Sequence, residues 1–319
     1  MTEKHTNSAV QIKRTSRFFW GFFFLLLISL LTSCQSLSFG KRSSRINEPK
    51  SEYIPDFFEW TAICPGIKSC TFENPSFPLR YIIVEIDLKS NDSMSNSTES
   101  NSTEYDSPGL MIQTWPDPQS FRHKYSPLPR KSIEDFAMEK SCVVAWNTCP
   151  FELWKSTGAT IEGVYKKDGK ILSEVMEKYA MLMVRKCGDG SGYEASILET
   201  QDEKATEDWD IAIGGFYMTL SDGEPCGTFR KTNDSRTAVG LSEDGRTMYV
   251  LSVEGEDAES STGLSYEQCN EIFMALGCFT AMQFDGGGST NLFLDGERAL
   301  SYPEERFSPC YMGVLRVER

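Results

Sequence analysis

Histidine is almost absent from this sequence, since the 319 residues include only His5 and His123. Zinc sites commonly use several histidines, and a serine-hydrolase triad needs one as its base. His5 falls within a predicted leader segment, so a triad would depend on His123 alone, in a proline-rich stretch. The scarcity of histidine therefore excludes His-rich zinc sites and argues against Ser-His-Asp catalysis.

Positive charge is also in short supply, with 32 lysines and arginines against 46 aspartates and glutamates and a formal net charge of −14. The first 33 residues carry one acid and four basic residues, a net +3, so the remainder of the chain stands at −17. Nucleic acids and polyphosphates need a basic surface. We therefore expect no nucleic-acid partner, although a single phosphate held by one arginine is compatible with this charge.

The N-terminal apolar run, Phe18–Leu31, has fourteen residues and is too short to cross a bilayer comfortably. Its length and the basic residues before it are typical of a secretory signal peptide. The run ends in Leu31-Thr32-Ser33-Cys34, which resembles a bacterial lipobox. We predict that residues 1–33 are a lipoprotein signal peptide and that Cys34 carries lipid (palmitate). The protein would then be exported and anchored to the membrane of the bacterial cell envelope; an uncleaved signal anchor is the alternative.

Ten cysteines are present, but no two form a Cys-x-x-Cys motif. Lipid on Cys34 would leave nine, an odd number that cannot all pair within the chain. Export permits disulfides, and the pairs closest in sequence are Cys64/Cys70 and Cys142/Cys149. The pairing itself does not follow from the sequence.

Composition divides the rest of the chain into a tether and one domain. Residues 34–55 are polar with scattered basic groups, and we interpret them as a tether from the lipid. Residues 56–319 have the length of a single catalytic-type domain. A stretch at about 89–108 is rich in Ser, Asn and Thr, and we expect it to be a disordered insertion.

Local patterns predict an α+β fold, in which antiparallel hairpins form most of a sheet and a small number of helices pack on it. Capping residues indicate two helices, beginning after Ser132 and Ser265. Tyr81–Leu88 is a strong strand candidate, and apolar strands follow the helices at 142–146 and 279–284. Asp-Gly pairs, the best short-range signal of a hairpin turn, stand between extended segments at Asp168, Asp222, Asp244 and Asp295.

Three glycines follow Asp285 and lead to Ser289 and a further apolar strand at 292–294. Consecutive glycines cost entropy to order, so they are kept where side chains would obstruct something. A Walker phosphate loop would need a lysine and a helix after the last glycine, and this sequence has Ser289 and a strand. Two interpretations remain: a structural Gly-rich hairpin, or a site for an anionic or polyhydroxylated ligand with Asp285 aimed into it. We favour the ligand site.

Three other strand ends carry residues suited to a binding site. Arg236 precedes an apolar strand, and its planar guanidinium suits the oxygens of a phosphodiester, with Asp234 close by in sequence. Paired Gly214 and Gly215 end a second strand, and Asn147 ends a third. Polar and glycine residues at four strand ends predict a site at one rim of a sheet.

Taken in order, five segments resemble the phosphodiester glycosidase family, that of the N-acetylglucosamine-1-phosphodiester α-N-acetylglucosaminidase. They are VVAWN, AIGGFYMTLSDG, SRTAVGLSEDGRTMYVLSVEG, GLSYEQCNEIFMALGCFTAMQFDGGGSTNLFLDG and MGVLRV. The resemblance extends from Tyr81 to Val317, and its Arg-Thr-Ala-x-Gly and Asp-Gly-Gly-Gly-Ser elements keep their order and flanking structure. It implies hydrolysis of a sugar-1-phosphodiester, with a carbohydrate phosphodiester as the partner.

The resemblance also implies roles for single residues. Arg236 would hold the phosphodiester, and Asp285 would act as a carboxylate in or near the reaction centre. Glycosyl transfer usually uses two carboxylates. Glu254, at the end of the strand after the third Asp-Gly pair, is the first candidate for the second one, and Asp234 is the other. The expected substrate-binding residues are Asn147, Gly214, Gly215, Asp234, Thr237, Gly286, Gly287, Gly288 and Ser289.

No cofactor is required by this chemistry, and no ligand spacing demands a metal. Asp285 and nearby acids could still bind a hard divalent cation through their oxygens.

One segment departs from the family pattern: where the family has Asn-Gly, a small residue and Phe, this chain has Asn147-Thr148-Cys149-Pro150-Phe151. Pro150 removes a backbone donor and fixes φ. Either the pocket is reshaped or turnover is lost. The leading hypothesis is an exported phosphodiester glycosidase acting on an envelope or exogenous glycan. The alternatives are a non-catalytic surface glycan-binding lipoprotein and a purely structural envelope lipoprotein.

Overall fold

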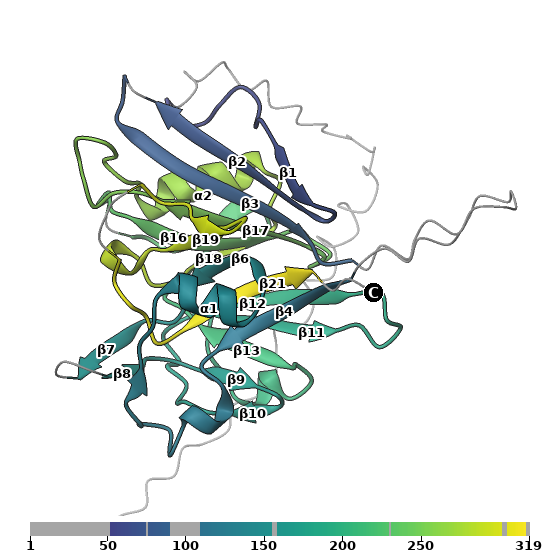
Figure 1. The fold of residues 1–319 in the computed structure, drawn as a ribbon. Helices are drawn as coiled ribbons and strands as arrows, with labels where there is room; N and C mark the ends of the chain where they lie inside the picture. The colour runs from purple at the N-terminus through teal and green to yellow at the C-terminus, as the bar shows by residue number, and fades with distance from the viewer. Residues whose placement is uncertain are drawn as a thin grey trace, which may run out of the picture. The chain divides into compact units, whose positions relative to one another are not determined.

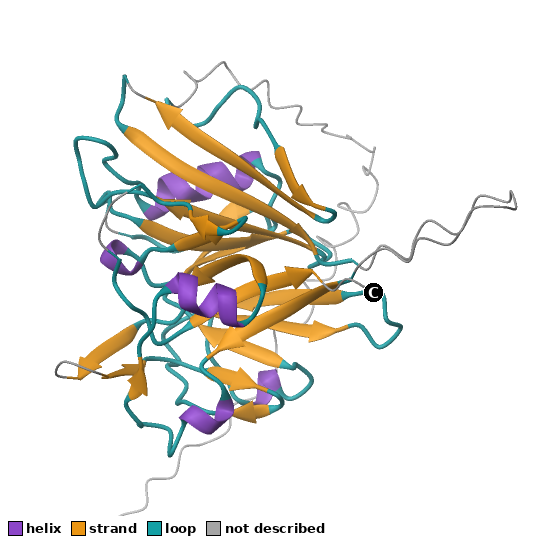
Figure 2. Ribbon diagram, viewed as in Figure 1, coloured by secondary structure: helices purple, strands orange, loops and turns teal. Residues whose placement is uncertain are grey.

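Antiparallel strands make up most of the chain in the computed structural model, which describes residues 52–74, 76–89, 109–154, 158–229, 231–301 and 305–316. The predicted signal peptide, Cys34, nearly all of the tether and the insertion beyond Lys89 lie outside the described residues. Lys50–Arg319 forms one compact unit. Figure 2 shows how strands dominate this unit.

Four sheets account for the strands of the described residues. The largest has the order β1 (Thr61–Cys64), β2 (Ile67–Asn74), β3 (Leu79–Asp87), β17 (Thr247–Val253), β16 (Arg236–Leu241), β18 (Thr280–Gln283), β14 (Met218–Ser221) and β15 (Glu224–Pro225). A five-stranded sheet has the order β10 (Lys170–Ile171), β9 (Tyr165–Lys167), β13 (Ile211–Gly214), β11 (Met181–Lys186) and β12 (Tyr193–Leu198). The other five-stranded sheet has the order β20 (Glu297–Arg298), β19 (Leu292–Leu294), β6 (Cys142–Asn147), β21 (Tyr311–Arg316) and β4 (Leu110–Trp115). The three-stranded sheet has the order β5 (Leu128–Pro129), β8 (Gly158–Ile161) and β7 (Phe151–Trp154).

The predicted hairpin turns are confirmed. The four pairs named in the prediction each join two neighbouring strands: β9 to β10, β14 to β15, β16 to β17 and β19 to β20. Three of these turns have positive φ at both residues, as at Asp222 (54°) and Gly223 (76°). Asp and Gly tolerate this conformation, which matches the twist of the flanking strands. At the β16–β17 turn only Gly245 has positive φ, because the turn is longer and closes through Ser242.

Two α-helices occur in the described part of the chain, where the capping residues predict them. In α1 (Ile133–Glu139), the Ser132 hydroxyl accepts from the Asp135 amide at 3.0 Å. In α2 (Tyr266–Ala275), Ser265 and Gln268 form a complete capping box. These bonds satisfy backbone amides that have no partner within the helix. None of the described helices is long and apolar enough to span a membrane.

The main hydrophobic core lies where the three larger sheets meet. It takes inward-facing residues from β3, β16, β17, β6, β21, β11 and β13. The opposite face of the eight-stranded sheet packs on α2, through side chains such as Tyr81, Leu251 and Phe273. α1 lies against β6 and β21, as Figure 1 shows, with Phe136 stacked on Tyr311. The fold is therefore mostly antiparallel β with two covering helices, for which the predicted α+β class is too loose a description.

Candidate active site

The pairing between β16 and β18 brings Arg236 and Asp285 to the same edge of the sheet. These neighbouring strands pair Ala238 with Gln283, and the Phe284 amide donates to the Thr237 carbonyl at 2.8 Å. Antiparallel strands run in opposite directions, so this register brings the start of β16 opposite the residue after β18. The two segments that the sequence singles out thus end at the same edge of the sheet.

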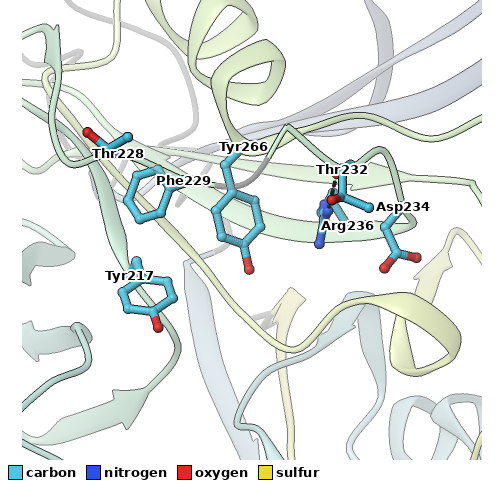
Figure 3. Close-up of a pocket in the computed structure, with 7 residues that line it drawn as sticks. All are labelled: Tyr217, Thr228, Phe229, Thr232, Asp234, Arg236 and Tyr266. Carbon is cyan, nitrogen blue, oxygen red and sulfur yellow. Dashed lines mark hydrogen bonds between the residues drawn. The ribbon is translucent and has the colours of Figure 1, made fainter.

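A cavity of about 630 Å³ opens beside this edge and is lined by Tyr217, Thr228, Phe229, Thr232, Asp234, Arg236 and Tyr266. Figure 3 shows its two sides: Tyr217 and Phe229 form an aromatic side, Arg236 and Asp234 form a charged side, and Tyr266 stands between them. The three aromatic rings lie in a row. The ring centroids of Tyr217 and Phe229 are 5.4 Å apart, and those of Phe229 and Tyr266 are also 5.4 Å apart. The volume is that of a small-molecule site.

The Arg236 side chain is held in one orientation. Nε donates to the Leu264 carbonyl at 2.9 Å, and Nη2 donates to the Thr232 carbonyl at 2.7 Å. The guanidinium lies 4.6 Å from the centroid of the Tyr266 ring, which favours a cation through its π-face. Burial raises the pKa of Tyr266 to about 12, so its hydroxyl stays protonated at neutral pH. Of the three guanidinium nitrogens, Nη1 makes no hydrogen bond within the described residues, and it can therefore bind a ligand oxygen.

Asp285 is partly buried, and this burial raises the pKa of its carboxyl to about 6. The Ser289 hydroxyl, the charge of Arg306 and the Gly286 amide favour the ionised form and oppose that rise. Glu162 contributes a nearby negative charge that raises the Asp285 pKa further. The carboxyl therefore changes protonation state near neutral pH, a property common at catalytic positions.

Gly286 and Gly288 each let a neighbouring group come close, whereas Gly287 has a left-handed backbone conformation. A Cβ on Gly286 would lie 2.8 Å from the Ser235 carbonyl oxygen. A Cβ on Gly288 would lie 2.5 Å from Nη2 of Arg306. Gly287 has a φ of 56° and faces the Asp234 carboxylate, whose Oδ1 would be 3.7 Å from a Cβ there. The glycines thus place Arg306 and Asp234 beside the Asp285 segment.

Gly286–Ser289 are predicted to bind the substrate, but two of their backbone amides already make hydrogen bonds within the protein. The Gly287 amide donates to the Ser235 carbonyl at 2.9 Å, and the Ser289 amide donates to the Gly286 carbonyl at 3.2 Å. The second bond belongs to a short 3-10 turn, Gly287–Ser289, and the first joins this turn to the residue before β16. The structure therefore assigns this stretch mainly to positioning Asp285, and a ligand would meet side chains as well as backbone.

Asn147 and Thr237 lie beneath the site rather than in the cavity. Both are fully buried. Nδ2 of Asn147 donates to the Asp285 carbonyl at 2.7 Å, while its Oδ1 accepts from the Thr237 hydroxyl at 2.7 Å and from the Asn291 amide at 2.9 Å. This network ties β6, β16 and the segment after β18 together, so Asn147 fixes the position of Asp285.

Gly214 and Gly215 also lie away from the cavity lining, where the chain passes from β13 to β14. A Cβ on Gly215 would meet the Gln283 carbonyl oxygen at 2.5 Å, and one on Gly214 would meet Nε2 of Gln201 at 2.7 Å. Close packing between sheets, rather than ligand contact, accounts for this glycine pair.

The structure does not bring Glu254 to the cavity. Its side chain is buried, with Oε1 accepting from the Ser301 amide at 2.7 Å and paired with Arg80, and Oε2 bonded to the Ser301 hydroxyl. Both carboxylate oxygens are engaged inside the protein, which corrects the expectation that Glu254 is the second carboxylate. Asp234, the other candidate, lines the cavity beside Arg236.

Sequence reasoning missed Arg306 and the aromatic side of the cavity. The sequence around Arg306 has no hydrophobic periodicity that would have drawn attention to it. Nη1 of Arg306 lies 3.3 Å from the Ser289 hydroxyl. Tyr266 could have been found, because the capping box fixes it as the first residue of α2. Among the described residues, no cluster of three or more His, Cys, Asp or Glu could hold a metal ion.

The family model for phosphodiester glycosidases matches residues 141–314, more than half of the chain. A search of curated proteins gives no significant match.

Three solved structures share the fold. The zebrafish N-acetylglucosamine-1-phosphodiester α-N-acetylglucosaminidase catalytic domain, auto-inhibited by its pro-peptide, has a TM-score of 0.55 and 20% identity, covering 81% of this chain and 86% of that one. A hypothetical protein from Synechocystis has a TM-score of 0.57 and 12% identity over 83% of this chain and 64% of that one. A putative exported protein from Burkholderia pseudomallei has a TM-score of 0.51 and 11% identity, over 74% of each chain. The family match spans β6, Arg236 and Asp285, and the chain belongs to the phosphodiester glycosidase family.

Proposed function

We propose that the protein hydrolyses a sugar-1-phosphodiester, cleaving the bond between the anomeric carbon and the phosphate oxygen. The observation that carries this proposal is the β16–β18 register, which brings Arg236, a residue of the cavity lining, and the Asp285 segment to the same edge of the sheet. The substrate would be a glycan of the envelope or its surroundings, and the protein would act there as an exported lipoprotein anchored through Cys34.

Arg236 would bind the phosphate. Its orientation is fixed by two carbonyl acceptors, and Nη1 remains for a phosphate oxygen. Arg306, on the other side of the glycine segment, supplies a second positive charge near Asp285. A phosphodiester carries one negative charge, and the phosphomonoester released by hydrolysis carries a second. Two arginines suit this increase in charge.

Asp285 would stabilise the positive charge that develops at the anomeric carbon, acting in its ionised form. The phosphomonoester is a weak base, so its departure needs little protonation. Water adds to the anomeric carbon, and Asp234 is positioned on the charged side of the cavity to accept a proton from that water. Because the Asp285 pKa lies at about 6, kcat/KM should rise with pH through this value.

The aromatic side of the cavity supports a carbohydrate substrate. Tyr217 is 39% exposed, so part of its ring is open to solvent. Pyranose rings have an apolar face that stacks on aromatic rings, while the Tyr266 hydroxyl and the Thr228 and Thr232 side chains can bond to sugar hydroxyls. A lipid chain would not use these polar groups.

The test is hydrolysis of a panel of sugar-1-phosphodiesters by purified protein that lacks residues 1–33. We expect free sugar and phosphomonoester, with kcat/KM reduced at least 100-fold in Arg236→Ala and in Asp285→Asn. Asp222→Asn, in an exposed hairpin turn, serves as the matched control for loss of a carboxylate. Turnover that persists unchanged in both site variants would overturn the assigned roles. Glycan affinity without any product from the wild type would instead favour the non-catalytic glycan-binding lipoprotein.

A further inference from the structure

Two buried thiols lie beside the segment that holds Asp285. Sγ of Cys149 and Sγ of Cys310 are 3.3 Å apart, and neither side chain is exposed to solvent. Both are free thiols in the structure. Among the described cysteines this is the only contact between two sulfur atoms within hydrogen-bonding distance. The pairs closest in sequence, including Cys142/Cys149, make no such contact.

The backbone around the two cysteines is fixed by strand pairing. β6 and β21 pair Asn147 with Tyr311, and the Thr148 amide donates to the Cys310 carbonyl at 3.3 Å. Cys149 and Cys310 therefore stand on adjacent, hydrogen-bonded segments. The sulfur atoms need to approach by only about 1.3 Å to reach the length of a disulfide bond, about 2.05 Å. Side-chain rotation can supply most of that movement.

We propose that Cys149 and Cys310 form a disulfide when the exported chain folds, and that this bond holds the Asn147–Thr148 segment beneath Asp285. The proposal rests on the export that is part of the proposed function, but not on the proposed hydrolysis, since it is argued from the two thiols and their surroundings.

The oxidant is a disulfide, either a small molecule such as oxidised glutathione or a thiol oxidase that carries one. One cysteine attacks a sulfur of that disulfide as a thiolate and forms a mixed disulfide, releasing the first thiol. The second cysteine then displaces the other thiol. Two electrons and two protons leave the protein with the two thiols, and one sulfur–sulfur bond forms in it.

Exchange takes place before the core closes. Both cysteine side chains are fully buried, so the folded protein gives a reagent no access to either sulfur atom. Once formed, the bond is shielded from reductants by the same burial.

The bond would act on the site through Thr148. The Thr148 carbonyl accepts from the Asp285 amide at 2.9 Å, and the Thr148 hydroxyl lies 2.9 Å from Sγ of Cys310. Asn147, one residue earlier, donates to the Asp285 carbonyl. Thr148 and Cys149 are also the residues at which this chain departs from the family's Asn-Gly-small pattern.

Differential alkylation of the wild-type protein tests the bond directly. The protein is produced by export into an oxidising compartment, purified without reductant, and labelled in denaturant before and after reduction. We expect Cys149 and Cys310 to label only after reduction, and their peptides to be joined in a non-reduced digest. Cys269 is the control, because it is equally buried but makes no contact with another sulfur atom, and it should label in denaturant alone. Labelling of Cys149 and Cys310 without reduction, or a bond from either to another cysteine, would overturn the proposal.

A thermal-unfolding cycle gives a second, independent answer. A disulfide that closes a long loop should raise Tm by about 5–15 °C in a domain of this size. Tm should then fall by the same amount in Cys149→Ala, in Cys310→Ala and in the double variant, because each of them removes the same bond. Cys269→Ala, combined with Cys149→Ala, should instead give additive losses. Additive losses between Cys149→Ala and Cys310→Ala would show that the two thiols pack independently and are not linked.

Discussion

At the scale of single residues, the surroundings of a carboxylate decide its role. Asp285 and Glu254 both follow strands of the eight-stranded sheet, and both were plausible catalytic acids from the sequence. Glu254 has its two oxygens paired with Arg80 and Ser301. Asp285 instead follows β18 at the sheet edge where β16 begins with Arg236; Asn147 and Thr148 hold its backbone, and the Ser289 hydroxyl and the Gly286 amide bond to its carboxyl. This difference arises from partners distant in sequence, which no local pattern encodes.

Neutral substitutions of these two carboxylates should change stability in opposite directions. The Asp285 pKa is raised to about 6 in the folded protein. The folded state thus binds the proton more tightly than the unfolded chain, and stability falls as pH rises from about 4 through 6. Asp285→Asn removes this penalty and should gain about 1–3 kcal/mol at pH 7.5, with a smaller gain at pH 4.5.

Glu254→Gln should instead lose stability at pH 7.5, because Arg80 loses a buried ion-pair partner. Urea unfolding of both variants at the two pH values gives the measurement. A loss of stability in Asp285→Asn at pH 7.5 would mean that the carboxylate is stabilised by its neighbours and not penalised by burial.

At the scale of elements, the capping box of α2 helps to hold Tyr266 in its place in the cavity lining. Tyr266 is the first residue of α2, and it lies under the guanidinium of Arg236. Ser265→Ala removes the cap, which should cost about 1 kcal/mol of stability and loosen Tyr266. We expect KM for a sugar-1-phosphodiester to rise about three- to ten-fold.

Ser132→Ala is the matched control, since it removes the cap of α1, which packs on β6 and β21 away from the cavity lining. It should lower Tm by a similar amount with KM unchanged. If KM rises equally in Ser265→Ala and Ser132→Ala, the rise is caused by general destabilisation and not by movement of Tyr266.

Glycines that look alike in sequence should respond differently to alanine. A Cβ on Gly215 would meet a backbone oxygen at 2.5 Å, between two packed sheets that cannot move apart easily. We expect Gly215→Ala to cost about 1–3 kcal/mol. A Cβ on Gly288 would meet the end of the exposed Arg306 side chain, which can swing away.

Gly288→Ala should therefore cost less than about 1 kcal/mol, yet lower kcat/KM by displacing Arg306 from Asp285. Unfolding curves and kinetics of the two variants, measured side by side, give the comparison. A larger loss of stability in Gly288→Ala than in Gly215→Ala would contradict this prediction.

These contrasts also show how far the sequence could predict the structure. Hairpin turns at Asp-Gly pairs and helix starts at Ser132 and Ser265 depend on chemistry within a few residues, and the structure confirms them. The juxtaposition of Arg236 and Asp285 followed from two motifs, but only the strand register explains it. The partners of Glu254, the packing of Gly215 and the approach of Arg306 depend on contacts between sheets, and they had no local signal.

At the scale of the whole molecule, net charge limits how the protein can stay at a membrane. The chain after residue 33 carries a formal charge of −17, so an anionic bilayer repels it. Attachment would then depend mainly on lipid at Cys34. We expect the wild type, expressed with its leader in a bacterial host, to remain in the membrane fraction at both low and high salt.

Cys34→Ala should move the protein to the soluble exported fraction at either salt concentration, because no second attachment remains. Cys64→Ala, a substitution of a partly exposed cysteine in β1, should leave the protein in the membrane fraction. Incorporation of labelled palmitate into the wild type and not into Cys34→Ala would identify the attachment. If Cys34→Ala stays in the membrane fraction, residues 18–31 are retained as an uncleaved signal anchor, and the active site would be tethered by protein rather than by lipid.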